Sequence, residues 1–145
     1  PEATRPWQHV LEPISGYLNL GQVLHENGVL HGEAFNFGPR SENNHTVRQL
    51  LEDLSKYWNF DHGEQAFLVT ANIPFNEARL LKLNCDKALF HLMWKANLDY
   101  METIRFTSEW YYQFYKTDNP ILEVTFEQIA EYVSLAKTRG LRWTE

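Results

Sequence analysis

Near its start the chain carries the stretch Arg5-Pro6-Trp7-Gln8-His9-Val10-Leu11-Glu12-Pro13. Proline has no backbone N–H to leave unpaired, so Pro13 suits the first turn of a helix. Apolar residues follow with helical spacing and predict a helix that ends before Asn27-Gly28: Ile14, Tyr17, Leu18, Leu20 and Leu24. A stretch that combines an arginine, two aromatic rings, an amide and a carboxylate within nine residues is typical of the middle of a longer protein rather than of a loose, polar terminus.

Arg5 is the residue of this stretch with the clearest chemistry. We expect it to lie beside the N-terminus of the predicted helix, where unpaired N–H groups and partial positive charge favour an anion. Its guanidinium adds paired donors that match phosphate oxygens. Arg5 is therefore a candidate for binding a phosphate or diphosphate, and the alternative is an ordinary surface arginine or one in a salt bridge.

The composition indicates one domain with a core of its own. Of the 145 residues, 43% are hydrophobic and 14% are aromatic, which is enough to bury a core. The net charge of −6 argues against nucleic acid or an anionic membrane as the main partner. No apolar run approaches the ~18 residues of a membrane span. Cys85 is the only cysteine, which excludes an intrachain disulfide and fits the reducing cytoplasm, where we expect the protein to act.

The rest of the pattern predicts an α+β fold, mainly helical with a few short strands. Two capping boxes open helices, at Thr46-Val47-Arg48-Gln49 and Thr125-Phe126-Glu127-Gln128, and Asp99 with Glu102 opens another. A short helix over 85–94 completes a set of five. Strands are predicted over 34–38, 65–70 and 80–83, and a turn over 61–63. These strands are too scattered for a sheet of their own. We therefore expect 34–38 to join a sheet supplied by other sequence, and both this segment and the first helix to expose unpartnered apolar surface.

The sequence lacks the common catalytic signatures. No two glycines have the G-x-G spacing of a dinucleotide loop, the sequence has no P-loop signature, and the histidines lack the H-E-x-x-H spacing of a metal site. Tyr112 and Lys116 match the Y-x-x-x-K spacing of short-chain dehydrogenases. Without a cofactor loop upstream, we interpret this match as the end of an aromatic helix with a C-terminal lysine. No catalytic, cofactor-binding or metal-binding residue is assigned to the chain.

Read in order, the motifs resemble the C-terminal part of the CDP-glucose 4,6-dehydratase family, a branch of the extended short-chain dehydrogenases/reductases. The resemblance rests on the opening stretch and on four later pieces: Phe35-Asn36-Phe37-Gly38-Pro39, Asn76-Glu77-Ala78 with Leu81-Lys82-Leu83-Asn84-Cys85-Asp86-Lys87-Ala88, Leu92-Met93-Trp94-Lys95-Ala96, and Thr107-Ser108-Glu109-Trp110-Tyr111. Asn76 stands where the family has histidine, and Asn84 where it has aspartate. These departures leave the choice of nucleotide and sugar open.

The resemblance implies that residues 1–145 form a single C-terminal substrate-binding domain. It implies that an N-terminal Rossmann domain, absent from this chain, carries NAD and the catalytic groups. In such an enzyme NAD oxidises the sugar at C4, water leaves across C5 and C6, and hydride returns to C6. The substrate is a nucleotide sugar such as CDP-glucose, in a pathway of lipopolysaccharide O-antigen biosynthesis, and the parent enzyme can be a homodimer.

The resemblance also places the substrate contacts of this chain at Arg5, Trp7, His9, Asn76, Glu77 and Arg79. Because the cofactor domain is absent, we expect the isolated chain to be inactive. Two alternatives stay open: part of a nucleotide-sugar epimerase or decarboxylase, and a nucleotide-sugar-binding module that catalyses nothing.

Overall fold

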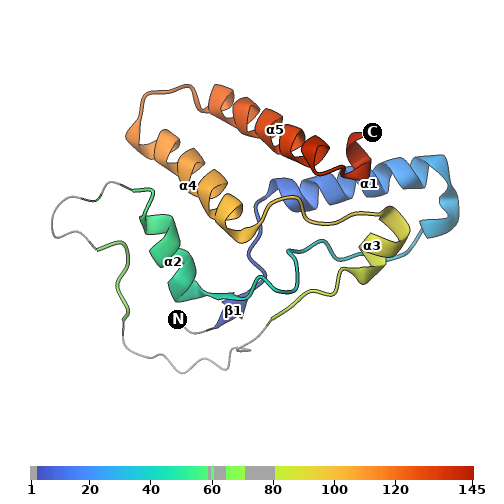
Figure 1. Cartoon of the computed structure of the whole chain (residues 1–145), viewed down its shortest axis with the longest axis horizontal. Coiled ribbons are helices and arrows are strands. Elements are labelled where there is room, and N and C mark those ends of the chain that lie inside the picture. Colours follow the sequence, from blue (N-terminus) through green and yellow to red (C-terminus); the bar gives the residue numbers. More distant parts are fainter. Residues whose placement is uncertain (1–2, 59, 61–64, 71–80) are drawn as a thin grey trace.

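The computed structural model describes residues 3–58, 60, 65–70 and 81–145 (Figure 1). Within these residues the chain forms helices and a single two-stranded sheet: β1 (Thr4–Arg5), α1 (Leu11–Glu26), the 3-10 helix η1 (Gly28–Leu30), β2 (His45–Thr46), α2 (Val47–Ser55), α3 (Asp86–Leu92), α4 (Tyr100–Lys116), α5 (Ile121–Thr138) and the 3-10 helix η2 (Arg142–Thr144). This mainly helical architecture agrees with the predicted α+β class. Among the described residues, no helix combines the length and the apolar character needed to cross a membrane.

Two helices begin at the caps that the sequence predicts. Before α2, the Thr46 hydroxyl accepts the backbone N–H of Gln49 at 3.1 Å, and the Gln49 side chain accepts the N–H of Thr46 at 2.9 Å. Asp99 and Glu102 make the same reciprocal pair before α4, at 2.8 and 2.9 Å. Both predictions are confirmed, because each cap is satisfied within four residues of chain.

The capping box predicted at 125–128 is wrong. Helix α5 already begins at Ile121, directly after Pro120, whose φ of −61° suits a helix start. Thr125 therefore lies inside the helix, where its hydroxyl donates to the Ile121 carbonyl at 2.8 Å. The same oxygen accepts the indole N–H of Trp110 at 2.8 Å, so this threonine links α5 to α4.

The predicted strands are also wrong. Residues 34–38, 65–70 and 81–83 form no strand in the structure, and residue 80 and the predicted turn over 61–63 lie outside the described residues. Strand formation needs a neighbouring backbone. The Phe37 carbonyl instead accepts a hydrogen bond from the side-chain amide of Gln8, at 3.0 Å. The apolar pattern of this segment thus predicted a conformation that requires a partner strand, which the described residues do not supply.

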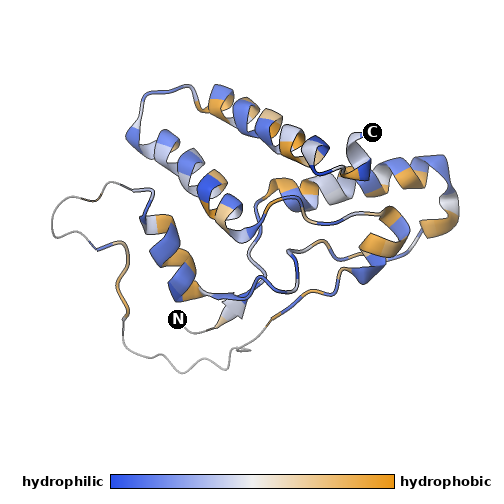
Figure 2. Cartoon of the chain, viewed as in Figure 1, coloured by the Kyte–Doolittle hydropathy of each residue, from blue (hydrophilic) through white to orange (hydrophobic). Residues whose placement is uncertain are grey.

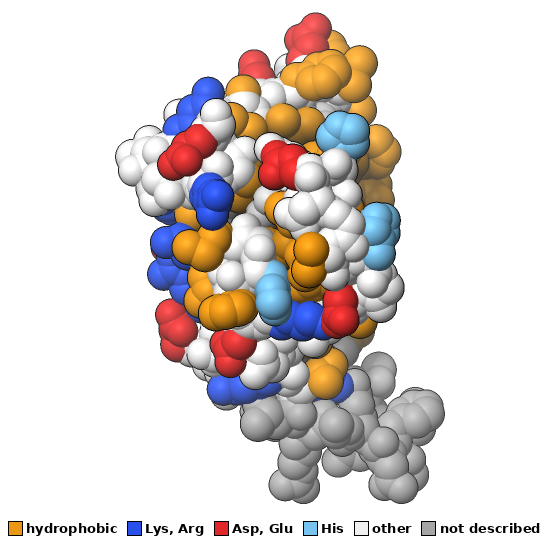
Figure 3. All heavy atoms as spheres, turned by 90° about the vertical axis from the view of Figure 1, so that its right-hand side faces the viewer, with side chains coloured by type: hydrophobic (Ala, Val, Ile, Leu, Met, Phe, Trp, Pro, Cys, Tyr) orange, Lys and Arg blue, Asp and Glu red, His pale blue; other side chains and the backbone are white. Residues whose placement is uncertain are grey.

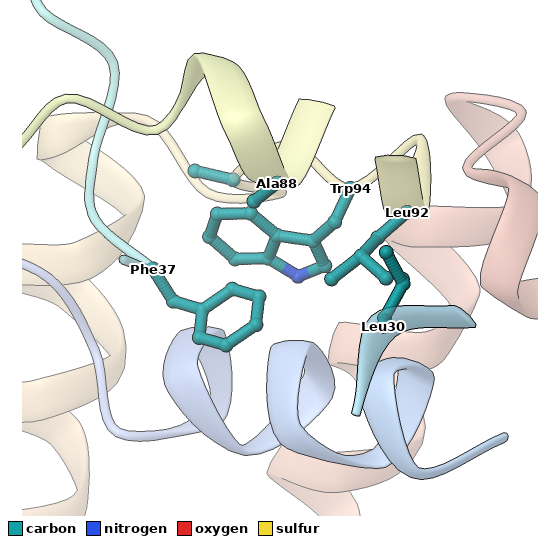
Figure 4. Packing of buried hydrophobic residues seen from close by; sticks show 6 residues of the cluster. Leu30, Phe37, Ala88, Leu92 and Trp94 are labelled. Atoms are coloured by element: carbon teal, nitrogen blue, oxygen red, sulfur yellow. The ribbon is translucent and has the colours of Figure 1, made fainter. Parts of the chain in front are cut away.

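The main core surrounds Trp94, which is 1% exposed (Figure 4). The ring of Phe37 meets the Trp94 ring edge to face, with centroids 4.9 Å apart. Ala88 and Leu92 cover the indole from α3. Phe37 is itself buried, so the prediction that 34–38 exposes apolar surface is wrong at this residue. A smaller cluster joins α4 to α5: Leu98, Phe106 and Tyr132.

Helix α1 turns an unusually polar face towards the core. Its buried residues are Glu12, Ser15, Gly16 and Asn19, whereas Ile14, Tyr17 and Leu18 are exposed. Figure 2 shows hydrophobic and hydrophilic residues alternating along α1, α4 and α5. The expectation that the first helix exposes apolar surface is confirmed.

Gly16 is required where α1 crosses Phe37. A Cβ at this position would lie 2.3 Å from Cδ1 of Phe37, and Trp94 blocks the ring from moving away. We expect Gly16→Ala to lower the free energy of unfolding by ~1–3 kcal/mol. Gly21 is the matched control on the same helix, because a Cβ there meets nothing within 4 Å. Gly21→Ala should raise stability by ~0.5–1 kcal/mol, as measured by urea unfolding. Equal effects of the two changes would contradict the close approach.

Candidate functional site

The backbone around Arg5 is fixed by the small sheet. Arg5 pairs with His45 and Thr4 with Thr46, antiparallel, and the Val47 N–H donates to the Ala3 carbonyl at 3.1 Å. Since β2 runs directly into α2, the helix whose first residues lie beside β1 is α2. Helix α1 begins at Leu11, and the expectation that Arg5 lies beside its start stays a prediction. The half-buried guanidinium donates to the Thr4 carbonyl at 2.7 Å.

Trp7 reinforces the same strand pair. Its indole N–H donates to the His45 carbonyl at 2.9 Å, and its backbone N–H donates to the Arg5 carbonyl at 2.9 Å. The His45 ring stacks on the ring of Tyr100, with centroids 3.5 Å apart and planes 8° from parallel. The Tyr100 hydroxyl in turn donates to Asp53 at 3.0 Å. The position of Arg5 is thus tied to α2 and α4 through His45.

A cavity of about 510 Å³ opens beside this stack. Its lining includes three carboxylates, those of Glu52, Asp53 and Asp99. The ammonium of Lys56, 2.6 Å from Asp53, holds the pKa of that carboxyl below its usual range. Burial and the same carboxylate raise the pKa of Tyr100, so its hydroxyl keeps its proton. So negative a lining disfavours a diphosphate inside this cavity.

His9 has different surroundings from Trp7. It is buried, and its ring meets Phe106 of α4 edge to face at 5.6 Å. Burial lowers the pKa of the imidazole to about 4, so the ring is neutral at pH 7. The Leu11 N–H donates to Nδ1 at 3.4 Å, which assigns the ring proton to Nε2. His9 therefore offers no positive charge to a phosphate, and its predicted role as a substrate contact is restricted to that of a neutral donor.

The remaining predicted contacts, Asn76, Glu77 and Arg79, fall in 71–80 and lie outside the described residues. Within the described part of the chain, no three His, Cys, Asp or Glu side chains are grouped to hold a metal ion.

Glu12 forms a buried polar centre that no sequence pattern signals. It is 1% exposed. The Leu98 N–H donates to Oε1 at 2.7 Å, the Asn97 N–H to Oε2 at 2.9 Å, and the Tyr132 hydroxyl to Oε2 at 3.1 Å. Burial raises the pKa of the Glu12 carboxyl, although these donors oppose the rise. Glu12 thus joins α1 to α5 and to the loop before α4.

Ser15 and Asn97 extend this centre. The Ser15 hydroxyl oxygen accepts the Trp94 indole N–H at 3.0 Å and lies 3.2 Å from the Tyr132 hydroxyl. The Asn97 side-chain amide donates to the Tyr132 carbonyl at 2.9 Å. Arg139 donates to the Asn97 carbonyl and pairs with Glu102 at 2.6 Å. The opening stretch therefore has two roles: Arg5 and Trp7 lie at the sheet, and Glu12 holds the helices together.

Comparison with known proteins supports the resemblance that the motifs indicate. Over 139 residues the chain is 34% identical to the CDP-glucose 4,6-dehydratase of Salmonella typhimurium, and this match confirms the resemblance. The match includes 96% of this chain but only 37% of that protein, so the chain spans little more than a third of its relative's length. No protein-family model matches the chain.

Proposed function

We propose that this chain is the substrate-binding portion of an NAD-dependent sugar-nucleotide 4,6-dehydratase that acts on CDP-glucose or a close relative. The observation that carries the proposal is the similarity to a CDP-glucose 4,6-dehydratase along 96% of the chain. In the full-length protein, residues 1–145 are the C-terminal domain, and a Rossmann domain outside this chain holds NAD. The enzyme acts in the cytoplasm, on a nucleotide sugar destined for O-antigen synthesis.

The residues of this chain do not fit an NAD site. No two of its glycines have G-x-G spacing, and the described strands pair antiparallel rather than in the parallel unit that binds dinucleotides. NAD supplies hydride transfer when it is bound to the other domain. The task of this chain is therefore to bind and orient the substrate.

Arg5 is the residue proposed to hold the diphosphate. Its planar guanidinium matches two phosphate oxygens at once. The Arg5–His45 pair and the Trp7 indole fix the backbone that carries this guanidinium. Binding energy from the diphosphate then orients the glucose ring for a reaction that occurs elsewhere on the substrate. Asn76, Glu77 and Arg79 are proposed to complete the contacts.

Replacing Arg5 tests this proposal. In the full-length protein, Arg5→Ala should weaken CDP-glucose binding by ~1.5–3 kcal/mol, about 10- to 150-fold in Kd, because a charged hydrogen bond is lost. The Kd of Arg5→Lys should lie between those of the wild type and Arg5→Ala, since lysine keeps the charge but loses the paired donors. Calorimetric titration measures the three constants. Arg142→Ala in η2 is the control, an exposed arginine at the far end of the chain. A Kd that Arg5→Ala leaves unchanged would remove Arg5 from the site.

A further inference from the structure

The backbone of Arg5 is held by a very short strand pair. Each strand has two residues, and a pair of this length has little stability of its own. Arg5 lies directly opposite His45 in this antiparallel pair. Residues in that relation project their side chains from the same face of the sheet, with Cβ atoms about 5 Å apart. The His45 ring is therefore the cross-strand neighbour of the Arg5 side chain, and contacts that fix His45 also fix the point from which Arg5 projects.

The His45 ring is fixed by Tyr100, the first residue of α4. The two rings are stacked, with centroids 3.5 Å apart and planes 8° from parallel. Tyr100 is itself buried, and its hydroxyl donates to Asp53 of α2 at 3.0 Å. Lys56 pairs with the same carboxylate at 2.6 Å. Because α2 follows β2 directly in the chain, these contacts lead from β2 to α4, from α4 to α2, and back to β2. The stack thus ties the His45 ring to two helices.

The stack is separate from the backbone contacts of the same residue. The Trp7 indole N–H donates to the backbone carbonyl of His45 at 2.9 Å, and the pairing with Arg5 also uses the backbone. A change of side chain at position 45 therefore leaves these bonds available and removes only the contact with Tyr100. The contribution of the ring to Arg5 is for this reason open to a separate test.

We infer that His45 is a positioning residue for substrate binding: stacked on Tyr100, its ring holds the strand pair so that the Arg5 guanidinium meets the diphosphate. This inference rests on the proposed function of Arg5. The contact that carries the role joins the faces of two rings, so a phenyl ring at position 45 replaces the imidazole. Since His45 acts through Arg5, its ring contributes nothing to binding once the guanidinium is removed.

Calorimetric titration of the full-length protein with CDP-glucose tests the first consequence. His45→Ala should raise the Kd about 2- to 10-fold, which corresponds to the loss of a stacked ring pair. The rise should stay below that of Arg5→Ala, because a residue that acts through Arg5 contributes no more than Arg5 itself. His45→Phe keeps a ring for Tyr100 and should bind like the wild type. A Kd for His45→Phe as high as that for His45→Ala would overturn the inference, since the substrate would then need the imidazole nitrogens.

A double-mutant cycle tests the second consequence, with a readout that a merely structural role does not move. The Kd of the variant that combines His45→Ala with Arg5→Ala should equal that of Arg5→Ala alone. Effects that add would show that His45 supports binding independently of Arg5, and the positioning role would be wrong. Tyr100→Phe provides the same cycle if His45→Ala does not fold, because it keeps the ring and removes only the hydrogen bond to Asp53. It should raise the Kd by less, and no rise would contradict the inference.

His25→Ala is the matched control, because His25 is exposed in the last turn of α1. Figure 3 faces the side of the molecule on which α1 ends, where histidine side chains lie at the surface among apolar and charged ones. The Kd of this variant should equal that of the wild type. The titrations also separate the inference from the proposed function. If Arg5→Ala leaves the Kd unchanged, the proposed function of Arg5 fails and the positioning role with it. If Arg5→Ala raises the Kd and His45→Ala does not, only the positioning role is wrong.

Discussion

Replacing Glu12 by alanine is expected to lower the free energy of unfolding by about 3–5 kcal/mol. The change leaves the backbone N–H groups of Asn97 and Leu98 and the hydroxyl of Tyr132 without their acceptor, in a site where Glu12 is 1% exposed. It also leaves a void between α1 and α5. Urea unfolding of the purified chain measures the effect. Glu26→Ala is the control, because Glu26 is exposed at the other end of the same helix. A loss below about 1 kcal/mol would contradict the role of Glu12 as the centre that joins these helices.

Glu12→Gln separates the charge of this side chain from its hydrogen bonds. The amide keeps one oxygen for the backbone donors and can donate to the Tyr132 oxygen, so we expect a smaller loss, ~1–2 kcal/mol at pH 7. Burial raises the pKa of Glu12 in the folded state above its ordinary value of 4.5. A raised pKa contributes stability that is fully present below that ordinary value and is lost as the pH rises through the folded pKa. Wild type should therefore lose stability relative to Glu12→Gln from pH 4.5 upwards, and a difference independent of pH would refute the raised pKa.

The predictions that succeeded depend on contacts close in sequence. The caps at Thr46 and Asp99 each need a partner three residues away, so the residue types at these two positions are enough to predict the helix start. Thr125 and Gln128 have the same residue types and spacing as Thr46 and Gln49, but the helix already begins after Pro120. Thr125 then bonds Trp110 and Gln128 bonds the Phe106 carbonyl, both on α4. These two side chains therefore bond to residues that are distant in sequence, which a local pattern cannot predict.

In the candidate site, too, the features set by nearby residues were predicted and those set by distant contacts were not. The chemistry of the opening stretch singled out Arg5, and the family resemblance added Trp7; the structure places both at the small sheet. It did not indicate that His45 is their common neighbour, since two-residue strands have no pattern of their own. Burial keeps the His9 ring neutral, and its predicted contact with the substrate stays a prediction. Glu12 was read as part of a helix start, because its partners lie 85 to 120 residues further along the chain.

Segment 34–38 is instructive because its composition is that of a strand. Phe35, Phe37 and their neighbours have the apolar character of a buried strand, and Phe37 is indeed buried. Its carbonyl bonds a side chain, that of Gln8, rather than a neighbouring strand. The expectation that this segment joins a sheet supplied by other sequence stays a prediction.

The purified 145-residue chain is expected not to convert CDP-glucose at all. Enzymes of ordinary efficiency accelerate their reactions by at least ~10⁶-fold, and we expect this chain to contribute none of that acceleration. Dehydration across a sugar requires a hydride acceptor, and the sequence has no glycine-rich loop to hold one. The groups that remain are suited to binding: Arg5 as a cation, and His9 as a ring that stays neutral above about pH 4. Product formation with added NAD, followed by chromatography of the sugar nucleotide, measures the rate.

Mixing the chain with the remainder of the full-length protein turns this negative expectation into a positive test. The remainder of the full-length protein, supplied as a separate polypeptide, should restore turnover when mixed with the chain, because the exposed apolar face of α1 (Ile14, Tyr17 and Leu18) gives it a surface to dock on. Leu18→Asp in the chain should weaken that rescue by placing a charge on this face of α1. Leu122→Asp on α5, where the side chain is 63% exposed against 71% for Leu18, should not. Turnover by the chain alone would refute the division of labour between the two parts. Rescue that is equally strong with Leu18→Asp would place the contact between them on another face of the chain.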